Sequence, residues 1–376
     1  MAGIYLHIPY CKVRCIYCDY YKETDETNID QFTEALCHEA KMRKQEMGDE
    51  VINTIYLGGG TPSRLHKEHM AMLFDTLYNH YTIAPDAEIT IEANPDDLTD
   101  EYINMLAATP INRFSIGIQS FDDDELRFLS RRHKGQQAID AVRAVQQAGF
   151  DNISIDLMYG LPKQTMELWK QNLQLAMQLD VQHVSAYHLI YERETKLYTL
   201  LQRGRVKPVE DELSLEMFDT LIETLALHGF EQYETSNFAK DKLYSRHNTS
   251  YWQNKKYLGL GPSAHSYDGD RRSWNVASLE RYIASLLRNE RDFEFETLTQ
   301  SEKYNEHVLT GIRTKWGVDL EVIREKFDVK YYDYFMQNVK RHFDSGFVFI
   351  EDNHLMLSRK GLFMTDGIAS DLMWVD

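Results

Sequence analysis

The segment Gly3-Ile4-Tyr5-Leu6-His7-Ile8-Pro9-Tyr10-Cys11-Lys12-Val13-Arg14-Cys15-Ile16-Tyr17-Cys18 carries the strongest structural signal in the chain. It joins a short, strand-like apolar run to a loop in which three cysteines have the spacing C-x3-C-x2-C. Thiolates are soft ligands that suit iron–sulfur clusters or zinc. Structural zinc sites usually take four ligands in two pairs, and no second pair with that spacing follows. Cys11, Cys15 and Cys18 are therefore predicted to hold an iron–sulfur cluster, with a zinc site as the alternative.

The composition argues against several classes of protein, among them nucleic-acid-binding and membrane-spanning proteins. The 376 residues include 41 Lys+Arg and 59 Asp+Glu, which gives a net charge of −18. Such an acidic chain is a poor candidate for binding nucleic acid, because phosphate contacts need clustered Lys and Arg. No run approaches the roughly 18 apolar residues of a transmembrane helix, and no basic, apolar leader opens the sequence. We expect a cytoplasmic protein. The fourth cysteine, Cys37, lies in a helical stretch and is expected to serve only in packing.

Strand-like and helix-like segments alternate through the first half of the chain. Strands are predicted over residues 3–8, 54–57, 88–92, 113–118, 152–158 and 183–189, and helices over 29–47, 69–81, 138–148 and 166–179. Strand then helix, repeated in this way, indicates a parallel sheet that either closes into a barrel or carries helices on both faces. Polar and glycine-rich residues follow the strands, at the edge where such folds place their active sites.

The pattern changes after about residue 200. A helix is predicted over 212–227, whereas residues 229–275 are rich in Gly, Asn, Ser and aromatics and show little periodicity. From Ser301 onward, helices lead to a terminal hairpin over 347–351 and 355–357. We therefore expect an α/β core over residues 1–200, an extension over 201–300 and a small, mainly helical C-terminal domain over 301–376.

The cysteine loop after a first strand resembles the signature of the radical S-adenosylmethionine (SAM) superfamily. The resemblance implies a partial (β/α)6 TIM-like barrel and a [4Fe–4S] cluster whose open iron is chelated by SAM. In that family reductive cleavage of SAM gives a 5′-deoxyadenosyl radical, so the cofactor supplies the chemistry and the protein positions it. The triplet Gly58-Gly59-Gly60 after the second strand looks like the family segment that approaches SAM through its backbone.

Several segments are more similar to one branch, the oxygen-independent coproporphyrinogen III oxidases and the related HemW family of haem chaperones. These segments are residues 5–11, 57–62, 91–95, 115–121, 156–162 and 259–265. The resemblance implies a SAM region lined by Tyr5, Gly59, Gly60, Thr61, Glu92, Gln119, Arg131 and Asp156. Glu92, at the end of the third strand, is in position to bond ribose hydroxyls. Ala186, Tyr187 and His265 are expected near this region.

Three features favour the chaperones over the oxidases. The oxidases carry a further cysteine two residues after the third, and this position is Tyr20 here. They also have a long N-terminal extension, whereas ten residues precede Cys11 in this sequence. The segment His247-Asn248-Thr249-Ser250-Tyr251-Trp252 matches the HNxxYW motif of the chaperone branch.

The HNxxYW segment is predicted to bind haem through His247, Asn248, Tyr251 and Trp252. Imidazole ligates haem iron, the two aromatic rings offer flat apolar surface, and an amide can orient the imidazole. Without the resemblance, a loop histidine beside two core aromatics is the simpler interpretation. His265 and His188 are other candidate haem ligands.

The resemblance therefore implies a haem chaperone that carries a SAM-linked [4Fe–4S] cluster and transfers haem to acceptor haemoproteins. No catalytic residue is assigned. An oxygen-independent coproporphyrinogen III oxidase is the main alternative, and a radical SAM enzyme acting on another tetrapyrrole is a more distant one. A homodimer and transient contact with membrane proteins stay open.

Overall fold

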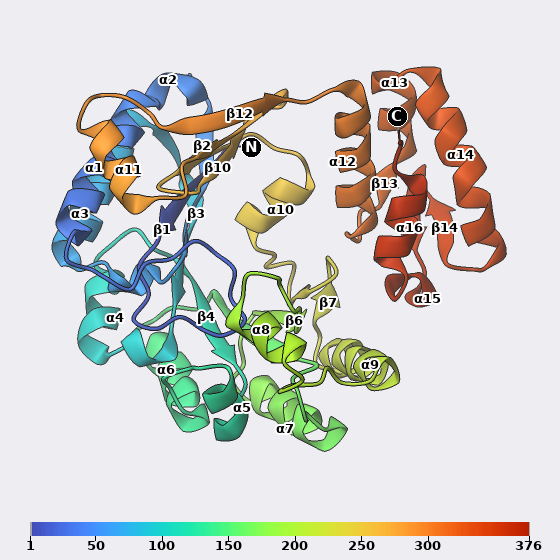
Figure 1. The fold of residues 1–376 in the computed structure, drawn as a ribbon, viewed down its shortest axis with the longest axis horizontal. Coiled ribbons are helices and arrows are strands. Elements are labelled where there is room, and N and C mark those ends of the chain that lie inside the picture. The colour runs from blue at the N-terminus through green and yellow to red at the C-terminus, as the bar shows by residue number, and fades with distance from the viewer. Residues whose placement is uncertain (1, 376) are drawn as a thin grey trace.

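Six parallel strands form the centre of the computed structural model, which describes residues 2–375 (Figure 1). They are β1 (Ala2–Ile8), β2 (Val51–Gly59), β3 (Thr82–Ala93), β4 (Arg113–Gln119), β5 (Ile153–Tyr159) and β6 (His183–His188). Each strand pairs with the next one in the chain. Each strand predicted in the first half of the chain corresponds to one of these, so the α/β fold with a partial (β/α)6 core is confirmed. The sheet stays open, because β1 and β6 each have a further, different neighbour.

Helices connect the parallel strands and cover the outer face of the sheet (Figure 1). They are α1 (Ile29–Met42), α2 (Lys44–Met47), η1 (Pro62–Arg64), α3 (Lys67–His80), η2 (Pro95–Asp97), α4 (Asp100–Ala107), α5 (Asp123–Phe128), α6 (Gly135–Gln147) and α7 (Met166–Met177). A further short helix, α8 (Lys196–Gln202), follows β6. The side chains of Ile4, Leu6 and Ile8 on β1 are buried in the same apolar core as side chains of α1, α3, α4, α6 and α7. Cys37, on α1, is buried there too, as predicted.

The second half of the chain extends the sheet at both edges. Its elements are α9 (Asp211–Leu227), β7 (Glu231–Gln232), β8 (Asn237–Ala239), α10 (Arg246–Trp252), β9 (Tyr257–Leu260), β10 (His265–Tyr267), β11 (Arg271–Asn275), α11 (Leu279–Leu286) and β12 (Phe293–Thr297). The full strand order is β12-β11-β10-β9-β1-β2-β3-β4-β5-β6-β8-β7. Segment 229–275, for which the sequence indicates little periodicity, therefore supplies short strands that join β1 on one side and β6 on the other.

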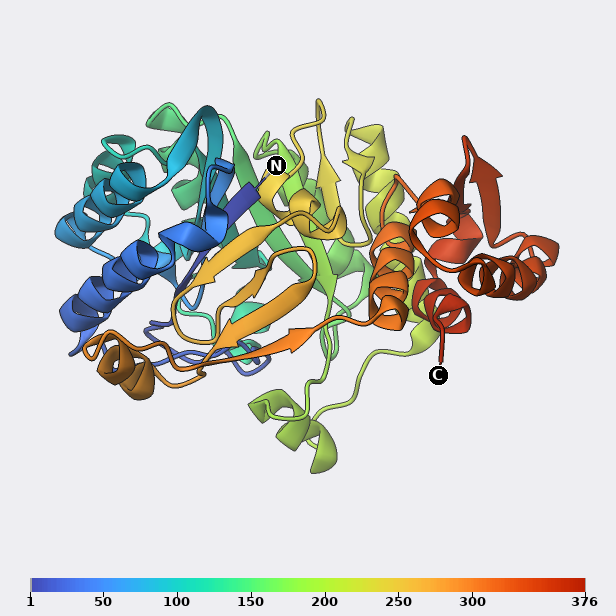
Figure 2. The same ribbon diagram turned by 90° about the horizontal axis from the view of Figure 1, so that it is seen from above.

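The last part of the chain has a core of its own. It contains α12 (Gln300–Ile312), β13 (Val318–Asp319), α13 (Leu320–Lys326), α14 (Val329–Asp344), β14 (Val348–Glu351), β15 (His354–Leu357), α15 (Arg359–Leu362) and α16 (Thr365–Leu372). This confirms a mainly helical C-terminal part with a terminal hairpin, which turns at Asp352 and Asn353 with φ values of 45° and 64°. In both ribbon views these elements stand at one end of the molecule (Figure 2).

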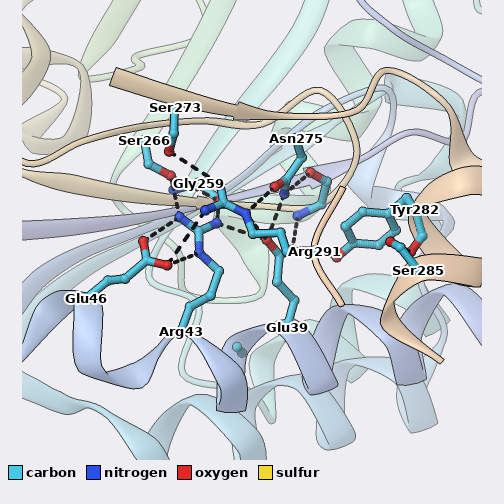
Figure 3. A network of polar contacts seen from close by, with 12 residues as sticks. Glu39, Arg43, Glu46, Gly259, Ser266, Ser273, Asn275, Tyr282, Ser285 and Arg291 are labelled. Carbon is cyan, nitrogen blue, oxygen red and sulfur yellow. Dashed lines mark hydrogen bonds and ion pairs between the residues drawn. The ribbon is translucent and has the colours of Figure 1, made fainter. Parts of the chain in front are cut away.

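A buried polar network joins α1 to the sheet extension formed by β9, β10, β11, α11 and β12 (Figure 3). Arg43 donates to the carboxylate of Glu39 at 2.9 Å, to the carbonyl of Gly259 at 2.6 Å and to the hydroxyl of Ser266 at 2.9 Å. The predicted helix over 29–47 is interrupted at Arg43, which lies between α1 and α2. Buried charges of this kind are stable only when they are paired and hydrogen-bonded. Among residues 2–375, no helix is long and apolar enough to cross a membrane.

Candidate functional site

The three clustered cysteines lie on a loop that leaves the end of β1. Two backbone hydrogen bonds close the base of this loop, from Cys11 to Glu23 at 2.8 Å and from Glu23 to Pro9 at 2.7 Å. Cys11, Cys15 and Cys18 are free, half-buried thiols, and all three line the same cavity. Burial raises the pKa of the Cys11 thiol. The loop therefore presents three thiols to one space.

Three thiols that line one cavity are the soft ligand set that an iron–sulfur cluster takes. In the part of the chain that the structure describes, no three Cys, His, Asp or Glu side chains are placed to hold one metal ion. A zinc ion would draw its thiolates together, because each Zn–S bond is only ~2.3 Å long. The thiolates of a [4Fe–4S] cluster bind different irons and lie further apart. Three such ligands leave the fourth iron to a ligand from outside the chain.

Arg131 reaches the cysteine loop from the segment after α5. It donates through Nη1 to Sγ of Cys15 at 3.5 Å, and through Nη2 to the Gly117 carbonyl at 2.6 Å and to the side chain of Asn94. Its Nε is buried and has no hydrogen-bond partner among the described residues. A guanidinium beside a thiolate stabilises the negative charge on sulfur. Arg131, predicted as a SAM contact, thus also contacts a cluster-loop cysteine.

A group of charges ties the cysteine loop to the end of β3. The buried carboxylate of Asp97 accepts from Lys12 Nζ at 2.5 Å and from Ser63 Oγ at 3.0 Å. Guanidinium nitrogens of Arg64 and Arg132 lie 3.6 Å and 3.4 Å from the same carboxylate. No sequence pattern predicts this group, although acidic residues directly follow the third strand. Because Lys12 lies inside the cysteine loop, the ion pair holds the loop against the sheet.

A cavity of about 390 Å³ lies beside the cysteine loop at the carboxyl ends of the parallel strands. Most of the predicted SAM residues line it, namely Gly59, Gly60, Thr61, Glu92, Gln119, Arg131 and Asp156. Tyr5 does not line this cavity, and its ring stacks on Tyr56 and His247 with centroids 6.2 Å and 6.4 Å away. Of the residues expected nearby, Tyr187 lines the cavity, whereas Ala186 and His265 do not.

Glycine is required at positions 59 and 60 by packing within the protein. Gly59 has a φ of 101°, and a Cβ there would lie 2.6 Å from the ring of His7. A Cβ on Gly60 would lie 2.7 Å from the backbone of Pro9, since its amide donates to the Ile8 carbonyl at 2.8 Å. The glycines therefore let the end of β2 pass directly against the end of β1, next to the cysteine loop.

Two carboxyl groups with raised pKa values line the cavity. Burial raises the pKa of Glu92 to about 7 and the pKa of Asp156 to about 6. Tyr56 donates to Glu92 at 2.8 Å, and Ser115 donates to Asp156 at 3.3 Å. Parallel pairing of Glu92 with Ser115 and of Gly117 with Asp156 brings both carboxyls to the same edge of the sheet. Their oxygens can accept hydrogen bonds from the hydroxyls of a ribose.

Apolar side chains are exposed around the mouth of the cavity. Val13 and Tyr20 of the cysteine loop, and Tyr187 and Ile190 after β6, all line it. The side chains of Tyr20 and Ile190 are 66% and 63% exposed. Exposed apolar residues grouped around a concave site are typical of a binding surface. Tyr20, the position where the oxidases carry a cysteine, thus forms part of this mouth.

The predicted haem-binding residues lie at the other end of the strands. His247, Asn248, Tyr251 and Trp252 all belong to α10, which contacts β1 and β2. His247 is only 1% exposed. Its Nδ1 lies 2.8 Å from Thr54 Oγ1, at the start of β2, and its Nε2 lies 2.7 Å from the Tyr251 hydroxyl. The structure therefore separates the predicted site residues into two groups.

Both ring nitrogens of His247 are engaged in this arrangement. Burial lowers the pKa of His247 to about 3, so the ring is neutral, with one donor and one acceptor nitrogen. Coordination of iron by His247 requires that one of its two hydrogen bonds break. The other two candidates are exposed. His188 lies 3.0 Å from Ser214 Oγ, and His265 stacks on Trp274 with centroids 5.6 Å apart.

Comparisons with known proteins agree with this geometry. The family model of the radical SAM superfamily matches residues 5–176, and that of the HemN C-terminal domain matches residues 298–364. Over 366 residues the chain is 34% identical to the heme chaperone HemW of Bacillus subtilis, with 96% of each chain covered. The chain belongs to the HemW family. The HemW of Lactococcus lactis is 32% identical, with 99% of this chain and 97% of the relative covered.

One further relative and one solved structure extend the comparison. A mitochondrial protein of Bos taurus, radical S-adenosyl methionine domain-containing protein 1, is 31% identical, with 99% of this chain and 87% of the relative covered. The fold resembles that of Escherichia coli coproporphyrinogen III oxidase HemN, with a TM-score of 0.86, 22% identity and 99% and 90% of the two chains covered. Membership of the radical SAM superfamily implies SAM and a [4Fe–4S] cluster. The three thiols and the adjoining cavity of this HemW-family chain fit both.

Proposed function

We propose that this chain is a haem chaperone, which binds haem, carries a SAM-coordinated [4Fe–4S] cluster and passes haem to acceptor haemoproteins. The observation that carries the proposal is its nearly full-length similarity to proteins named heme chaperone HemW in Bacillus subtilis and Lactococcus lactis. The residue two positions after Cys18 supports it, because Tyr20 stands where the oxidases have a further cysteine.

The proposed cofactor sites follow the cavity. Cys11, Cys15 and Cys18 hold the cluster, and SAM occupies the space lined by Gly59, Gly60, Thr61, Glu92, Gln119, Arg131 and Asp156. Tyr5 contributes to this site indirectly, because its ring stacks on Tyr56, whose hydroxyl donates to Glu92. Thiolate ligands need a reducing compartment, which supports a cytoplasmic location. Acceptor haemoproteins in the membrane would be met through transient contacts.

The proposed haem ligand is His247, with Asn248, Tyr251 and Trp252 around it. For this role α10 has to move away from Thr54, because His247 is enclosed by β1 and β2. A haem that docks instead at the cavity mouth, against Tyr20 and Ile190, would be within reach of the exposed His188.

Haem titration of the anaerobically reconstituted protein tests the function. We expect a saturable Soret band at a stoichiometry of one haem per chain. Thr54→Val removes one hydrogen bond that holds His247 and should speed haem uptake, whereas His247→Ala should abolish the histidine signature in the haem spectrum. His188→Ala is the matched control at the cavity mouth and should leave the spectrum unchanged.

Three results would overturn these proposals. The absence of saturable haem binding would remove the chaperone assignment. An unchanged Soret band in folded His247→Ala protein, together with its loss in His188→Ala, would move haem to the cavity mouth. Catalytic formation of protoporphyrinogen from coproporphyrinogen III, in an anaerobic assay with SAM and a reductant, would make the chain an oxidase.

A further inference from the structure

The twelve-stranded sheet ends in an uncovered edge at β12. Among residues 2–375, the only strand that pairs with β12 is β11, which runs antiparallel to it with Phe293 opposite Asn275 and Thr297 opposite Arg271. All five residues of β12 are exposed. In Figure 1 the strand lies along the upper rim of the molecule, where it leads into α12. Natural edge strands are usually shielded, because their free backbone groups pair readily with another chain.

The hydrogen bonds at both ends of β12 fix its orientation. The amide of Val276 donates to the carbonyl of Asp292 at 2.9 Å, and the amide of Leu298 donates to the carbonyl of Asp270 at 2.9 Å. In an antiparallel ladder, hydrogen-bonded residues alternate along each strand. The even-numbered residues of this segment therefore direct their N–H and C=O groups toward β11.

The odd-numbered residues consequently direct their backbone groups outward. These are Phe293, Phe295 and Thr297, and each offers one N–H and one C=O at the free edge. The spacing is that of a regular strand, so an added strand finds donors and acceptors in register. An extended segment can add to such an exposed edge by β-augmentation.

The side chains on the two faces of β12 differ in kind. Phe293 and Phe295 share one face, where they are 41% and 54% exposed. The guanidinium carbons of Arg291 and Arg271 lie 4.0 Å and 4.1 Å from their ring centroids. A hollow of about 310 Å³ adjoins the two rings. This face is suited to apolar residues.

The opposite face of β12 is acidic. It carries Glu294 and Glu296, both exposed, of which Glu296 lies 3.3 Å from Arg272. A second copy of the chain, paired about Phe295, would place glutamate opposite glutamate on this face. Like charges directly opposite one another destabilise a strand pair, whereas opposite charges stabilise it. The charge pattern therefore disfavours self-pairing and favours a basic partner strand.

We propose that the free edge of β12 docks an extended segment of a partner protein. The segment adds as a further strand, with Lys or Arg opposite Glu294 and Glu296 and apolar residues beside the two phenyl rings. Backbone hydrogen bonds supply binding, and the two faces supply specificity. This surface is distinct from the cavity and from α10, so the inference does not depend on where haem binds.

Synthetic peptides test the chemistry of the docking site on the full-length protein. The probe is a fluorescent hexapeptide, blocked at both ends, in which Lys alternates with Val and Phe, and binding is followed by fluorescence anisotropy. We expect saturable binding, and the same peptide with Glu in place of Lys should bind ~10-fold more weakly. A third peptide, N-methylated at alternate amides, loses its edge-facing donors and should not bind.

Variants at the edge test its location. Thr297→Pro removes an outward N–H but no bond to β11, since proline is tolerated at such edge positions. It should abolish peptide binding, whereas its matched control Thr297→Val should not. Glu294→Lys leaves one positive and one negative position on this face and should abolish the preference for the Lys peptide. Unchanged binding by Thr297→Pro, an unchanged preference in Glu294→Lys, or a dimer in sedimentation that Thr297→Pro dissociates would each refute the proposal.

Discussion

Replacing Glu39 by glutamine should strongly destabilise the contact between α1 and the sheet extension. The side chain of Glu39 is 1% exposed. One carboxylate oxygen accepts from Arg43 at 2.9 Å and from Asn275 at 2.7 Å. The other accepts from the Gly261 amide at 2.9 Å and from the Tyr282 hydroxyl at 2.6 Å. Four donors, each from a different element of the fold, thus converge on one buried carboxylate.

The expected magnitude follows from this geometry. Glutamine turns one of the two oxygens into an NH2 group that faces two donors, and it leaves Arg43 without its buried counter-charge. Loss of one partner from a buried ion pair costs ~3–5 kcal/mol. Because Arg43 keeps a bond of 2.7 Å to Glu46, we expect the lower end of this range. With an unfolding entropy of ~2.1 cal/mol/K per residue over a module of roughly 300 residues, ~3 kcal/mol lowers Tm by ~5 °C.

Differential scanning calorimetry measures this change, with hydrogen exchange to assign the transition, because the C-terminal core can unfold separately. Glu46→Gln is the matched control. It makes the same chemical change on a carboxylate that pairs with the same arginine, but the side chain of Glu46 is 45% exposed. Exposed pairs contribute ~1 kcal/mol or less, so Tm should fall by less than ~2 °C. Equal shifts for the two variants would refute the argument from burial.

Three further outcomes follow from the site. Arg131→Met removes the bond to Cys15, so the cluster's reduction potential should fall by ~60 mV in an EPR-monitored titration. Asp97→Asn weakens the ion pair with Lys12, and iron should be lost ~10-fold faster under chelator, followed by absorbance. The pKa of Glu92 is raised from 4.5 to about 7, so the folded state binds more protons than the unfolded state in that interval. Glu92 alone should lower the stability of the ligand-free protein by ~2–3 kcal/mol as pH rises through the interval. Urea unfolding of Glu92→Gln should lose this part of the fall and keep the part due to Asp156, whose pKa is raised to about 6.

The repeated strand–helix pattern allows the parallel core to be predicted from sequence. Strands such as β1 and β5 are mainly apolar and are buried over nearly their full length, and the helices that follow have a regular apolar stripe. The sheet extension has no comparable signal. Strands of two to five residues, such as β7 and β11, are too short for a period to emerge, and their pairing depends on contacts across the fold. The interruption of the first helix at Arg43 likewise reflects a tertiary bond, to the carbonyl of Gly259, 216 residues away.

Some features of the candidate site could likewise be predicted from sequence, and others could not. The spacing of Cys11, Cys15 and Cys18 is local, and their common cavity could be anticipated from it. The partner of Lys12 could not be anticipated, because Asp97 is 85 residues away in the sequence. The parallel pairing of β1, β2 and β3 brings the two residues together. The enclosed position of His247 also depends on tertiary contacts, with residues far away in the sequence. A histidine four residues before a tyrosine on a short helix gives no indication of which strands will cover it.

Tyr56, on β2, contacts both the cavity residue Glu92 and His247 of α10. Its hydroxyl donates to Glu92 at the cavity, and its ring stacks on His247 with centroids 5.2 Å apart. If His247 moves to coordinate haem, the ring that positions Glu92 loses a stacking partner, so haem and SAM must influence each other's affinity. Such coupling is reciprocal: the factor by which SAM changes haem affinity equals the factor by which haem changes SAM affinity. A haem bound by His188 at the cavity mouth would leave this stack intact. Coupling that disappears in a Tyr56→Leu variant therefore indicates that haem binds at α10.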